Sequence, residues 1–297
     1  MVSVLIVDCH VHSSGNESVD VILKGMEKAG IDKAIVFSPY PSFSPGEGGR
    51  LAPTAGVTRH LGFSYPDVTS ERQREAVEFI ARLQKEAPDR IIGFVWLEPR
   101  LKDAVQLVEW AITSKELKGV KMIPDHWYPY DEFMYPIYRK VEELGVPILF
   151  HSGILFGFKD SSRFCRPVNY EVLVSFPKLR FALAHISWPW VDECIALWGR
   201  FRAALRERGE GAENMQMFID ITPGTPLIYR RESLQKLIAY GAEDYMVFGT
   251  DCSAGRLGYA RYHVERDVAI LTQEIGVSRK TVDKILGGNA LKFLGMK

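Results

Sequence analysis

The stretch "SVLIVDCHVH", residues 3–12, joins an apolar run to an alternating pattern of polar and apolar side chains. Asp8, His10 and His12 occupy every second position within it. Because side chains on a β-strand point alternately to opposite faces, these three polar groups share one face of a predicted first strand. An acid and two imidazoles on one face are either core groups with satisfied hydrogen bonds or the beginning of a converging site.

Seven more apolar, β-branched runs follow the first one, and helical patterns separate them. The eight predicted strands lie at residues 3–10, 33–38, 91–97, 117–123, 146–152, 179–185, 215–221 and 244–251. Continuous apolar strands that alternate with amphipathic helices favour a parallel sheet buried on both faces. Eight such units predict an α/β fold of the (β/α)8 TIM-barrel type, as a single domain over residues 1–297.

An open doubly wound sheet is the alternative architecture. It usually carries a glycine-rich phosphate turn after its first strand, but "HVHSSG" at residues 10–15 has no GxGxxG pattern. Predicted helices at 18–31 and 135–146 contain their stop signals, Gly30 and Gly145. The barrel therefore remains the favoured prediction.

A long segment rich in proline, glycine and serine separates the second and third predicted strands, at residues 39–68. Segments of this length without a secondary-structure pattern are usually lids, binding loops or disordered inserts. Because it follows the carboxyl end of a strand, we expect a lid-like insertion after strand 2, over the active-site face of the same domain.

The charge balance narrows the class of partner. Lys plus Arg and Asp plus Glu both number 37, so the formal net charge is zero with histidine neutral. No basic excess is present to neutralise a nucleic-acid backbone or an anionic membrane, which favours a small-molecule substrate.

The chain shows no signal-peptide or membrane-span pattern, and its four cysteines lack CxxC spacing. A cytoplasmic protein with reduced thiols is expected.

Unusual polar residues fall at the carboxyl ends of the predicted strands. They are His10, His12, Lys121, His151, His185, Asp220 and Asp251. In a barrel these ends meet at one mouth, where catalytic groups lie. Several imidazoles and carboxylates that face one cavity are costly unless they are paired, and a divalent metal is such a partner. These ligand types suit zinc, and an open coordination position lets a bound water ionise near neutral pH.

Several of these strand ends resemble the motifs of a known family, the amidohydrolase superfamily. The motifs are "VDCHVH" at 7–12, "GVKM" at 119–122, "ILFHSG" at 148–153, "ALAHIS" at 182–187 and "VFGTD" at 247–251. The most similar branch is the amidohydrolase-related group, which includes aminocarboxymuconate-semialdehyde decarboxylase. "ILGGNALKFLG" at 285–295 resembles the closing helix of that branch. The resemblance covers nearly the whole chain.

The resemblance implies a metal site and two catalytic residues. His10, His12, His151 and Asp251 would hold one divalent metal, usually zinc, with manganese or iron as alternatives. Asp251 would be both a ligand and the base for the metal-activated water. His185 would polarise the substrate or shuttle a proton from the edge of the site. Many relatives form dimers, so a homodimer is an option.

Lys121 leaves the number of metals open. In two-metal members of the superfamily, a lysine at the end of the fourth strand is carboxylated and bridges the metals, and His185 would then bind the second metal. A lysine in a "GVK" strand is also frequent in the one-metal branch. We expect one metal. Asp8 is expected to support the ligands from behind.

Three functions fit these motifs. The favoured one is hydrolysis, in which a metal-activated water attacks an amide, ester or lactone. The alternative is non-oxidative decarboxylation of an aromatic or unsaturated carboxylic acid by the same ligand set. A barrel that binds a ligand without turnover is the third, non-enzymatic, reading.

The loops that follow the strands suggest the kind of substrate. We predict that His126, Trp127, Arg163 and Trp188 bind it. Aromatic side chains are frequent in these loops, and arginines can clamp a carboxylate; the arginines concerned are Arg50, Arg59, Arg163 and Arg166. The alternative is that the aromatics pack the loops against the barrel and the arginines face water. As a group, these residues favour a small aromatic or carboxylate-bearing substrate.

Overall fold

The computed structural model describes residues 4–40, 68–156 and 159–296. The predicted lid-like insertion at 39–68 falls almost entirely outside the described residues, as do Arg50 and Arg59. None of the helices in the described part of the chain has the length and apolarity that a membrane span requires.

The described residues form one parallel sheet of nine strands. The strands are β1 Val7–His12, β2 Lys33–Phe37, β3 Ile91–Trp96, β4 Gly119–Met122, β5 Ile148–Phe150, β6 Phe181–Leu183, β7 Met217–Asp220, β8 Met246–Val247 and β9 Cys252–Ser253. Their order in the sheet is β8-β7-β6-β5-β4-β3-β2-β1-β9. Each of the eight predicted runs overlaps an observed strand, and the order along the sheet follows the order along the chain.

Only Met246–Val247 of the last predicted strand, 244–251, forms a strand, β8, and this corrects the sequence prediction. Asp251 adopts φ +57°, a left-handed conformation that a strand does not contain, and β9 begins after it at Cys252. The segment still closes the ring of strands. Ile221 N donates to Val247 O on one side, and Cys9 N donates to Phe248 O on the other, both at 2.9 Å. The predicted TIM barrel is confirmed.

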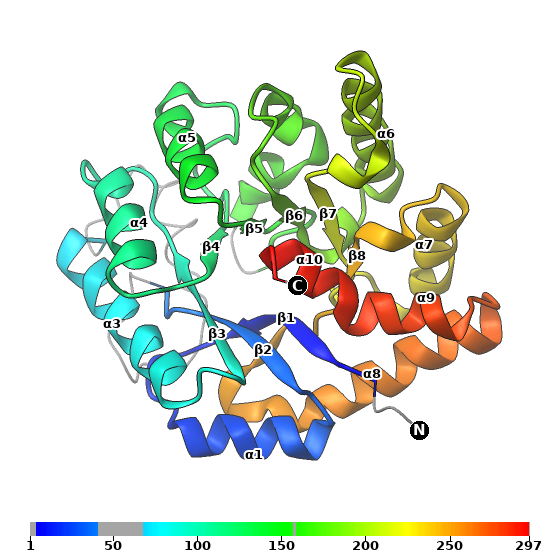
Figure 1. Ribbon diagram of the computed structural model, residues 1–297, viewed down its shortest axis with the longest axis horizontal. Coiled ribbons are helices and arrows are strands. Elements are labelled where there is room, and N and C mark those ends of the chain that lie inside the picture. Colours follow the sequence, from blue (N-terminus) through cyan, green and yellow to red (C-terminus); the bar gives the residue numbers. More distant parts are fainter. Residues whose placement is uncertain (1–3, 41–67, 157–158, 297) are drawn as a thin grey trace.

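Helices surround the sheet, most of them along its outside and the last one across one end (Figure 1). They are α1 Val19–Ala29, α3 Ser70–Glu86, α4 Ala104–Thr113, α5 Tyr135–Leu144, α6 Val191–Glu207, α7 Leu227–Ala239, α8 Ala260–Ala269, α9 Arg279–Asp283 and α10 Asn289–Leu294. The stop signals are confirmed, since α1 and α5 end at Gly30 and Gly145 with φ +73° and +67°. Glycine adopts this left-handed cap without the penalty of a Cβ atom.

Short helical turns fill most of the remaining connections. The 3-10 turns are η1 Glu132–Met134, η2 Lys159–Cys165, η3 Pro167–Ser175, η4 Ala184–Ser187, η5 Ala212–Asn214, η6 Glu243–Tyr245 and η7 Ala254–Tyr259; η8 Ile270–Glu274 and η9 Lys284–Gly288 are π-helical. η4 matters most for function, because it carries His185 directly after β6.

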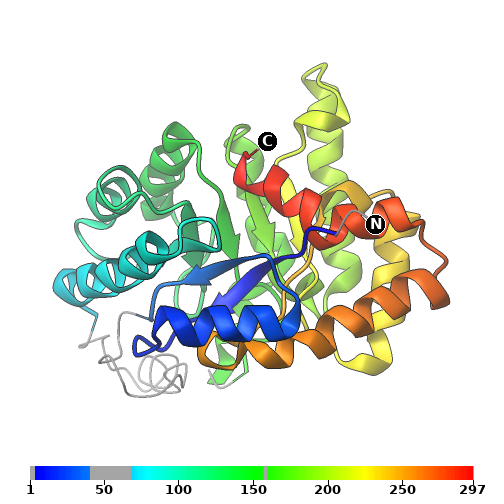
Figure 2. The ribbon, with the colours of Figure 1, turned by 60° about the horizontal axis from the view of Figure 1, so that its bottom comes forward.

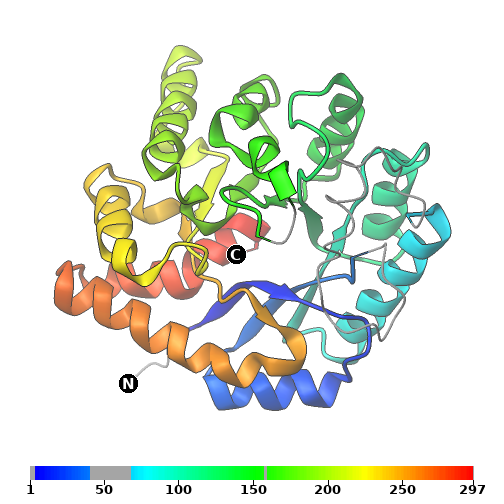
Figure 3. The ribbon, with the colours of Figure 1, turned by 180° about the vertical axis from the view of Figure 1, so that it is seen from behind.

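The two ends of the barrel differ. Helix α10 lies across one end in Figures 1 and 2. Its Phe293 ring packs 5.3 Å from Phe218 and 6.4 Å from Phe94, and Asn289 donates to Met246 O at 2.7 Å. Since Met246 begins β8, α10 covers the amino ends of the strands. The carboxyl ends therefore open on the opposite side, which Figure 3 presents to the viewer.

Candidate metal centre

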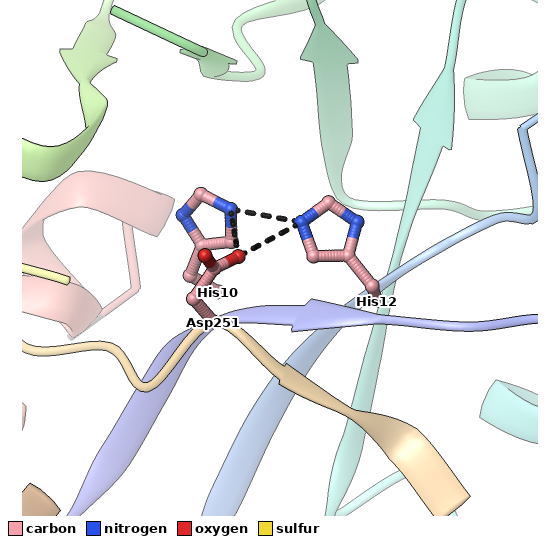
Figure 4. A group of neighbouring side chains, drawn as sticks. All are labelled: His10, His12 and Asp251. Carbon is pink, nitrogen blue, oxygen red and sulfur yellow. Dashed lines mark hydrogen bonds and ion pairs between the residues drawn. The ribbon is translucent and has the colours of Figure 1, made fainter. Parts of the chain in front are cut away.

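Three of the four predicted metal ligands converge at the carboxyl end of β1. The Nε2 atoms of His10 and His12 are 3.1 Å apart, and Asp251 Oδ1 lies 3.4 Å from the first and 3.1 Å from the second. Figure 4 shows the three side chains pointing toward one another. Within the described ranges, these three residues form the group of possible ligands whose donor atoms all lie within 4.8 Å of one another. We call His10, His12 and Asp251 the mouth cluster.

The backbone brings these side chains together. His10 and His12 lie two positions apart on β1, so their rings extend from the same face. Asp251 N donates to His10 O at 2.9 Å, and its left-handed backbone turns the carboxylate toward the rings. The neighbouring Gly249 permits this approach, since a Cβ there would lie 2.9 Å from His10 Cβ and 2.5 Å from a Thr222 carbon.

A buried carboxylate fixes the proton on His10. Asp220 Oδ2, fully buried at the end of β7, lies 2.6 Å from His10 Nδ1. Burial raises the pKa of Asp220 to about 6, so it is charged at neutral pH and can only accept. His10 therefore carries its hydrogen on Nδ1, and its Nε2 lone pair faces the mouth cluster. Sequence reasoning placed Asp220 at a strand end without assigning this role; its spacing after an apolar run was the available signal.

Asp8 supports the site through the backbone. Its Oδ1 accepts from Thr250 N at 2.9 Å and from His10 N at 3.1 Å, and its Oδ2 accepts from Thr250 Oγ1 at 2.5 Å. Burial raises the pKa of Asp8 to about 7. These contacts hold the turn that carries Asp251, so Asp8 positions the acidic ligand and touches neither imidazole ring nitrogen.

The donor atoms of the mouth cluster fit a divalent metal. Burial and the nearby Lys121 charge lower the pKa of His10 well below its ordinary value, so the ring is neutral. Burial opposes charge on Asp251, but its hydrogen bond with His12 acts in the other direction, and the pKa of this carboxyl lies well below the usual range. The His10 and His12 imidazoles and the Asp251 carboxylate are the donor set of a divalent transition-metal site.

Lys121 lies directly beside the mouth cluster. Its fully buried Nζ is 3.3 Å from His10 Nε2 and 4.7 Å from the centre of the Phe37 ring. Burial lowers the pKa of Lys121 to about 8. Lys121 Nζ therefore lies beside the same ring nitrogen that faces Asp251.

His185 and His151 form the next part of the wall. The His185 ring centre lies 5.1 Å from that of His10 and 4.9 Å from that of His151. His151 is not brought into the mouth cluster, and its Nε2 lies 3.2 Å from Ile154 O, to which it donates. Its role as a fourth ligand stays a prediction. Burial lowers the pKa of His185 to about 4, so this ring too is neutral.

The predicted sixth strand, 179–185, is too long. Strand β6 ends at Leu183, and His185 belongs to η4 with φ +62°. His185 thus reaches the mouth on a turn, not at the end of a strand.

His126 lies in a different histidine–carboxylate group, which we call the rim cluster, made of Glu98, Asp125 and His126. Its Nδ1 contacts Asp125 Oδ1, and its Nε2 lies 3.1 Å from Glu98 Oε1. Trp127 beside it is 1% exposed and belongs to the main hydrophobic core. Substrate contacts by His126 and Trp127 stay predictions, and both side chains are deeply buried.

The other two predicted substrate residues lie elsewhere in the loops. Trp188 is half-buried and stacks on Tyr229, with ring centres 6.1 Å apart. The two rings line a groove of about 470 Å³ that also includes Asp192 and Lys236. Arg163 is exposed, and its guanidinium lies 4.8 Å from the centre of the Phe164 ring. Their substrate contacts also stay predictions.

Known structures share this architecture over almost the whole chain. An uncharacterised TIM-barrel protein from Bordetella bronchiseptica matches with a TM-score of 0.66 and 18% identity, covering 98% of both chains. A 2,6-dihydroxybenzoate decarboxylase from Rhizobium matches at 0.66 and 16%, covering 99% of both. A 4-oxalomesaconate hydratase from Rhodopseudomonas palustris matches at 0.64 and 19%, covering 98% of this chain and 96% of that one. At these identities the likeness shows the fold.

Comparison with curated protein sequences gives no match. The family model described as "Amidohydrolase" matches residues 7–296, from the first residue of β1 to the end of the closing helix region. The match includes every member of the mouth cluster and the residues that support it. The chain therefore belongs to the amidohydrolase family.

Proposed function

We propose that this protein is a metal-dependent hydrolase that acts on an amide, ester or lactone of a small carboxylate-bearing or aromatic substrate. The observation that carries the proposal is the mouth cluster, where two imidazole nitrogens and one carboxylate oxygen converge at the open end of the barrel. The Asp251 side chain is 36% exposed, so a substrate can reach it, whereas His10 is buried behind it.

His10, His12 and Asp251 would hold the metal, with His151 as the further ligand that the family resemblance implies. A bound divalent metal supplies Lewis-acid activation of water near neutral pH. Zinc fits this donor set, and manganese and iron fit it as well. A dihydroxybenzoic acid decarboxylase from Polaromonas, similar in fold at a TM-score of 0.67 and 15% identity, was solved with bound manganese. We propose one metal per chain.

The side chains have distinct tasks in this reaction. Asp251 takes the proton from the attacking water, because its carboxylate is charged and accessible. His185 is neutral and lies between His10 and His151, where it can accept or return a proton at the substrate. Lys121 adds a positive charge behind His10, which favours an anionic substrate group at the mouth.

The names of proteins with similar structures support a carboxylic acid as the substrate class. Three of these proteins are named for dihydroxybenzoate, oxalomesaconate and carboxyvanillate. A fourth is a probable 2-pyrone-4,6-dicarboxylic acid hydrolase from Acinetobacter baumannii, with a TM-score of 0.60 and 10% identity. Decarboxylation of an aromatic or unsaturated acid is the second candidate, and the decarboxylases among these similar folds favour it.

A paired substrate panel separates the two reactions. The protein is stripped of metal and reloaded with zinc, manganese or iron, and then given lactones, esters and amides of aromatic acids beside the free acids. Hydrolysis of members of the first set with no release of carbon dioxide from the second supports the proposal. Carbon dioxide release without hydrolysis would replace it with the decarboxylase.

A further inference from the structure

The backbone that carries His185 is strained. His185, Ile186 and Ser187 have consecutive φ values of +62°, +51° and +55°. Residues with a side chain rarely adopt this left-handed region, least of all a β-branched one, and each costs on the order of 1 kcal/mol or more. Such a run persists only when neighbouring groups hold it. The contacts around residues 185–187 therefore identify the groups that hold this conformation.

The loop after β7 holds His185 at three points. Thr222 Oγ1 lies 2.8 Å from the imidazole Nδ1, and Thr225 Oγ1 donates to His185 O at 3.0 Å. Between them, the Gly224 backbone packs against the ring, since a Cβ there would lie 2.5 Å from His185 Cβ and Cγ. We call Thr222, Gly224 and Thr225 the His185 cradle. The cradle contacts the imidazole Nδ1, the backbone carbonyl and one side of the His185 ring.

The opposite flank is held from the β5 side. Ser152 Oγ donates to Ser187 Oγ at 2.8 Å, and Ile154 N donates to Trp188 O at 2.8 Å. These bonds fix the backbone after His185 but do not reach its ring. Among the described residues, Thr222 alone hydrogen-bonds an imidazole nitrogen of His185.

Thr222 is itself tied to the metal ligands. Its backbone N donates to Asp220 Oδ1 at 2.8 Å, and the other oxygen of this carboxylate accepts from His10 Nδ1 at 2.6 Å. One buried side chain thus sets the position of both the His10 ring and the hydroxyl that contacts His185. The positions of the His10 and His185 rings therefore both depend on the Asp220 carboxylate.

We propose that Thr222 is a positioning residue that locks the His185 imidazole, with Nδ1 held by the loop and Nε2 left to exchange a proton with the substrate. The proposal rests on the proposed function for the identity of that reaction. It follows from the cradle geometry, because the Gly224 backbone packs against one face of the ring and the Thr222 hydroxyl bonds Nδ1, which together decide which ring edge points to the loop.

The first experiment observes the ring directly and needs no substrate. Imidazole ¹⁵N and ¹H spectra of zinc-loaded protein are compared for the parent, Thr222→Val, Thr222→Ser and the distant control Thr272→Val, with His185→Gln to assign the signal. We expect a single hydrogen-bonded Nδ1 in the parent, in Thr222→Ser and in the control. Thr222→Val should show exchange between ring states. An unchanged His185 signal in Thr222→Val would overturn the proposal.

The second experiment measures the consequence with 4-nitrophenyl acetate as the probe ester. Thr222→Val should lower kcat about tenfold, as expected when a proton-transfer group loses its alignment, and leave KM and zinc content unchanged. Thr222→Ser should restore kcat to within about twofold, because it returns the hydroxyl. A parallel loss in Thr222→Ser, or a fall in zinc content, would assign Thr222 a structural role and overturn the proposal.

The two experiments separate this inference from the function that it builds on. If no zinc-loaded form cleaves any ester, amide or lactone while the spectra show the expected loss of ring alignment, the hydrolase assignment fails and the positioning role of Thr222 stands. If the parent is active and the spectra and kcat of Thr222→Val match the parent, the positioning role fails and the hydrolase assignment stands.

Discussion

The mouth cluster and the rim cluster both combine histidine with carboxylate side chains, yet they differ in what their nitrogen atoms face. In the rim cluster, both nitrogens of the single His126 ring contact carboxylates, and the three side chains are 1–6% exposed. In the mouth cluster, one carboxylate oxygen faces the Nε2 atoms of two rings, and Asp251 is 36% exposed.

This difference explains why the two clusters suit different tasks. In the rim cluster each nitrogen of the His126 ring has a carboxylate partner within the cluster, so this ring is a weaker candidate for a metal ligand than the rings of the mouth cluster. In the mouth cluster, Asp220 accepts a hydrogen bond from His10 Nδ1, so the lone pair on Nε2 is available for a metal. Proximity of histidine to carboxylate is therefore a weaker criterion for a metal site than the direction of the free lone pairs.

The largest expected effect comes from removing the accessible ligand. Asp251→Asn should lower metal affinity by at least about 100-fold and abolish turnover, because a neutral amide is a poor ligand and a poor base. The barrel should stay folded, since asparagine tolerates the left-handed backbone at this position. Metal content per chain, circular dichroism and activity measure the three outcomes.

A matched change in the rim cluster serves as the control. Asp125→Asn should retain the metal content of the parent, because its carboxylate lies with His126 and not with the mouth cluster. Equal metal loss in both variants would show that the two clusters are one functional unit.

The next effect separates metal binding from proton transfer. His185→Ala should keep the metal and lower kcat by about 100-fold or more, the usual contribution of a general acid or base. The reason is that the His185 ring lies beside the His10 ring, with ring centres 5.1 Å apart, and lies outside the three-ligand group. Metal analysis beside kinetics provides the measurement. Loss of metal in this variant would favour the two-metal arrangement.

A substitution in the rim cluster should change the free energy of unfolding and leave the metal content unchanged. His126→Gln should lower the free energy of unfolding by about 1–3 kcal/mol, because it removes the contact between the buried His126 ring and the buried Glu98 carboxylate. Urea denaturation of the metal-loaded protein measures this difference. If His126→Gln matched the parent in stability but lost metal, the division between the two clusters would be wrong.

The smallest expected effect concerns the number of metals. Lys121→Met should still bind one metal per chain, with affinity changed by less than about tenfold, because Lys121 lies beside the cluster and supplies no carboxylate. Methionine fills the buried space without a charge. Metal stoichiometry together with the intact mass of the parent tests this. Two metals in the parent, a carbon dioxide adduct on Lys121 and metal loss in the variant would establish the bridged two-metal site.

Much of the fold was predictable because apolar runs have a regular cause. Strands buried on both faces must be continuously apolar, and glycine ends a helix wherever a left-handed cap is needed, as at Gly30. The errors lie at strand ends. His185 and Asp251 both adopt positive φ, and a sequence pattern does not indicate such a conformation at a non-glycine residue.

By itself, the sequence determined the barrel, the histidine pair on one face of β1, and the family, since each depends on local periodicity or on ordered motifs. Only the tertiary structure decided which groups meet. It joined His10 to Asp220, distant in the chain, and left His151 bonded to Ile154 O. It also placed His126 between two carboxylates. The physical reason is that hydrogen-bond direction depends on ring orientation, which packing between distant strands fixes and local sequence does not.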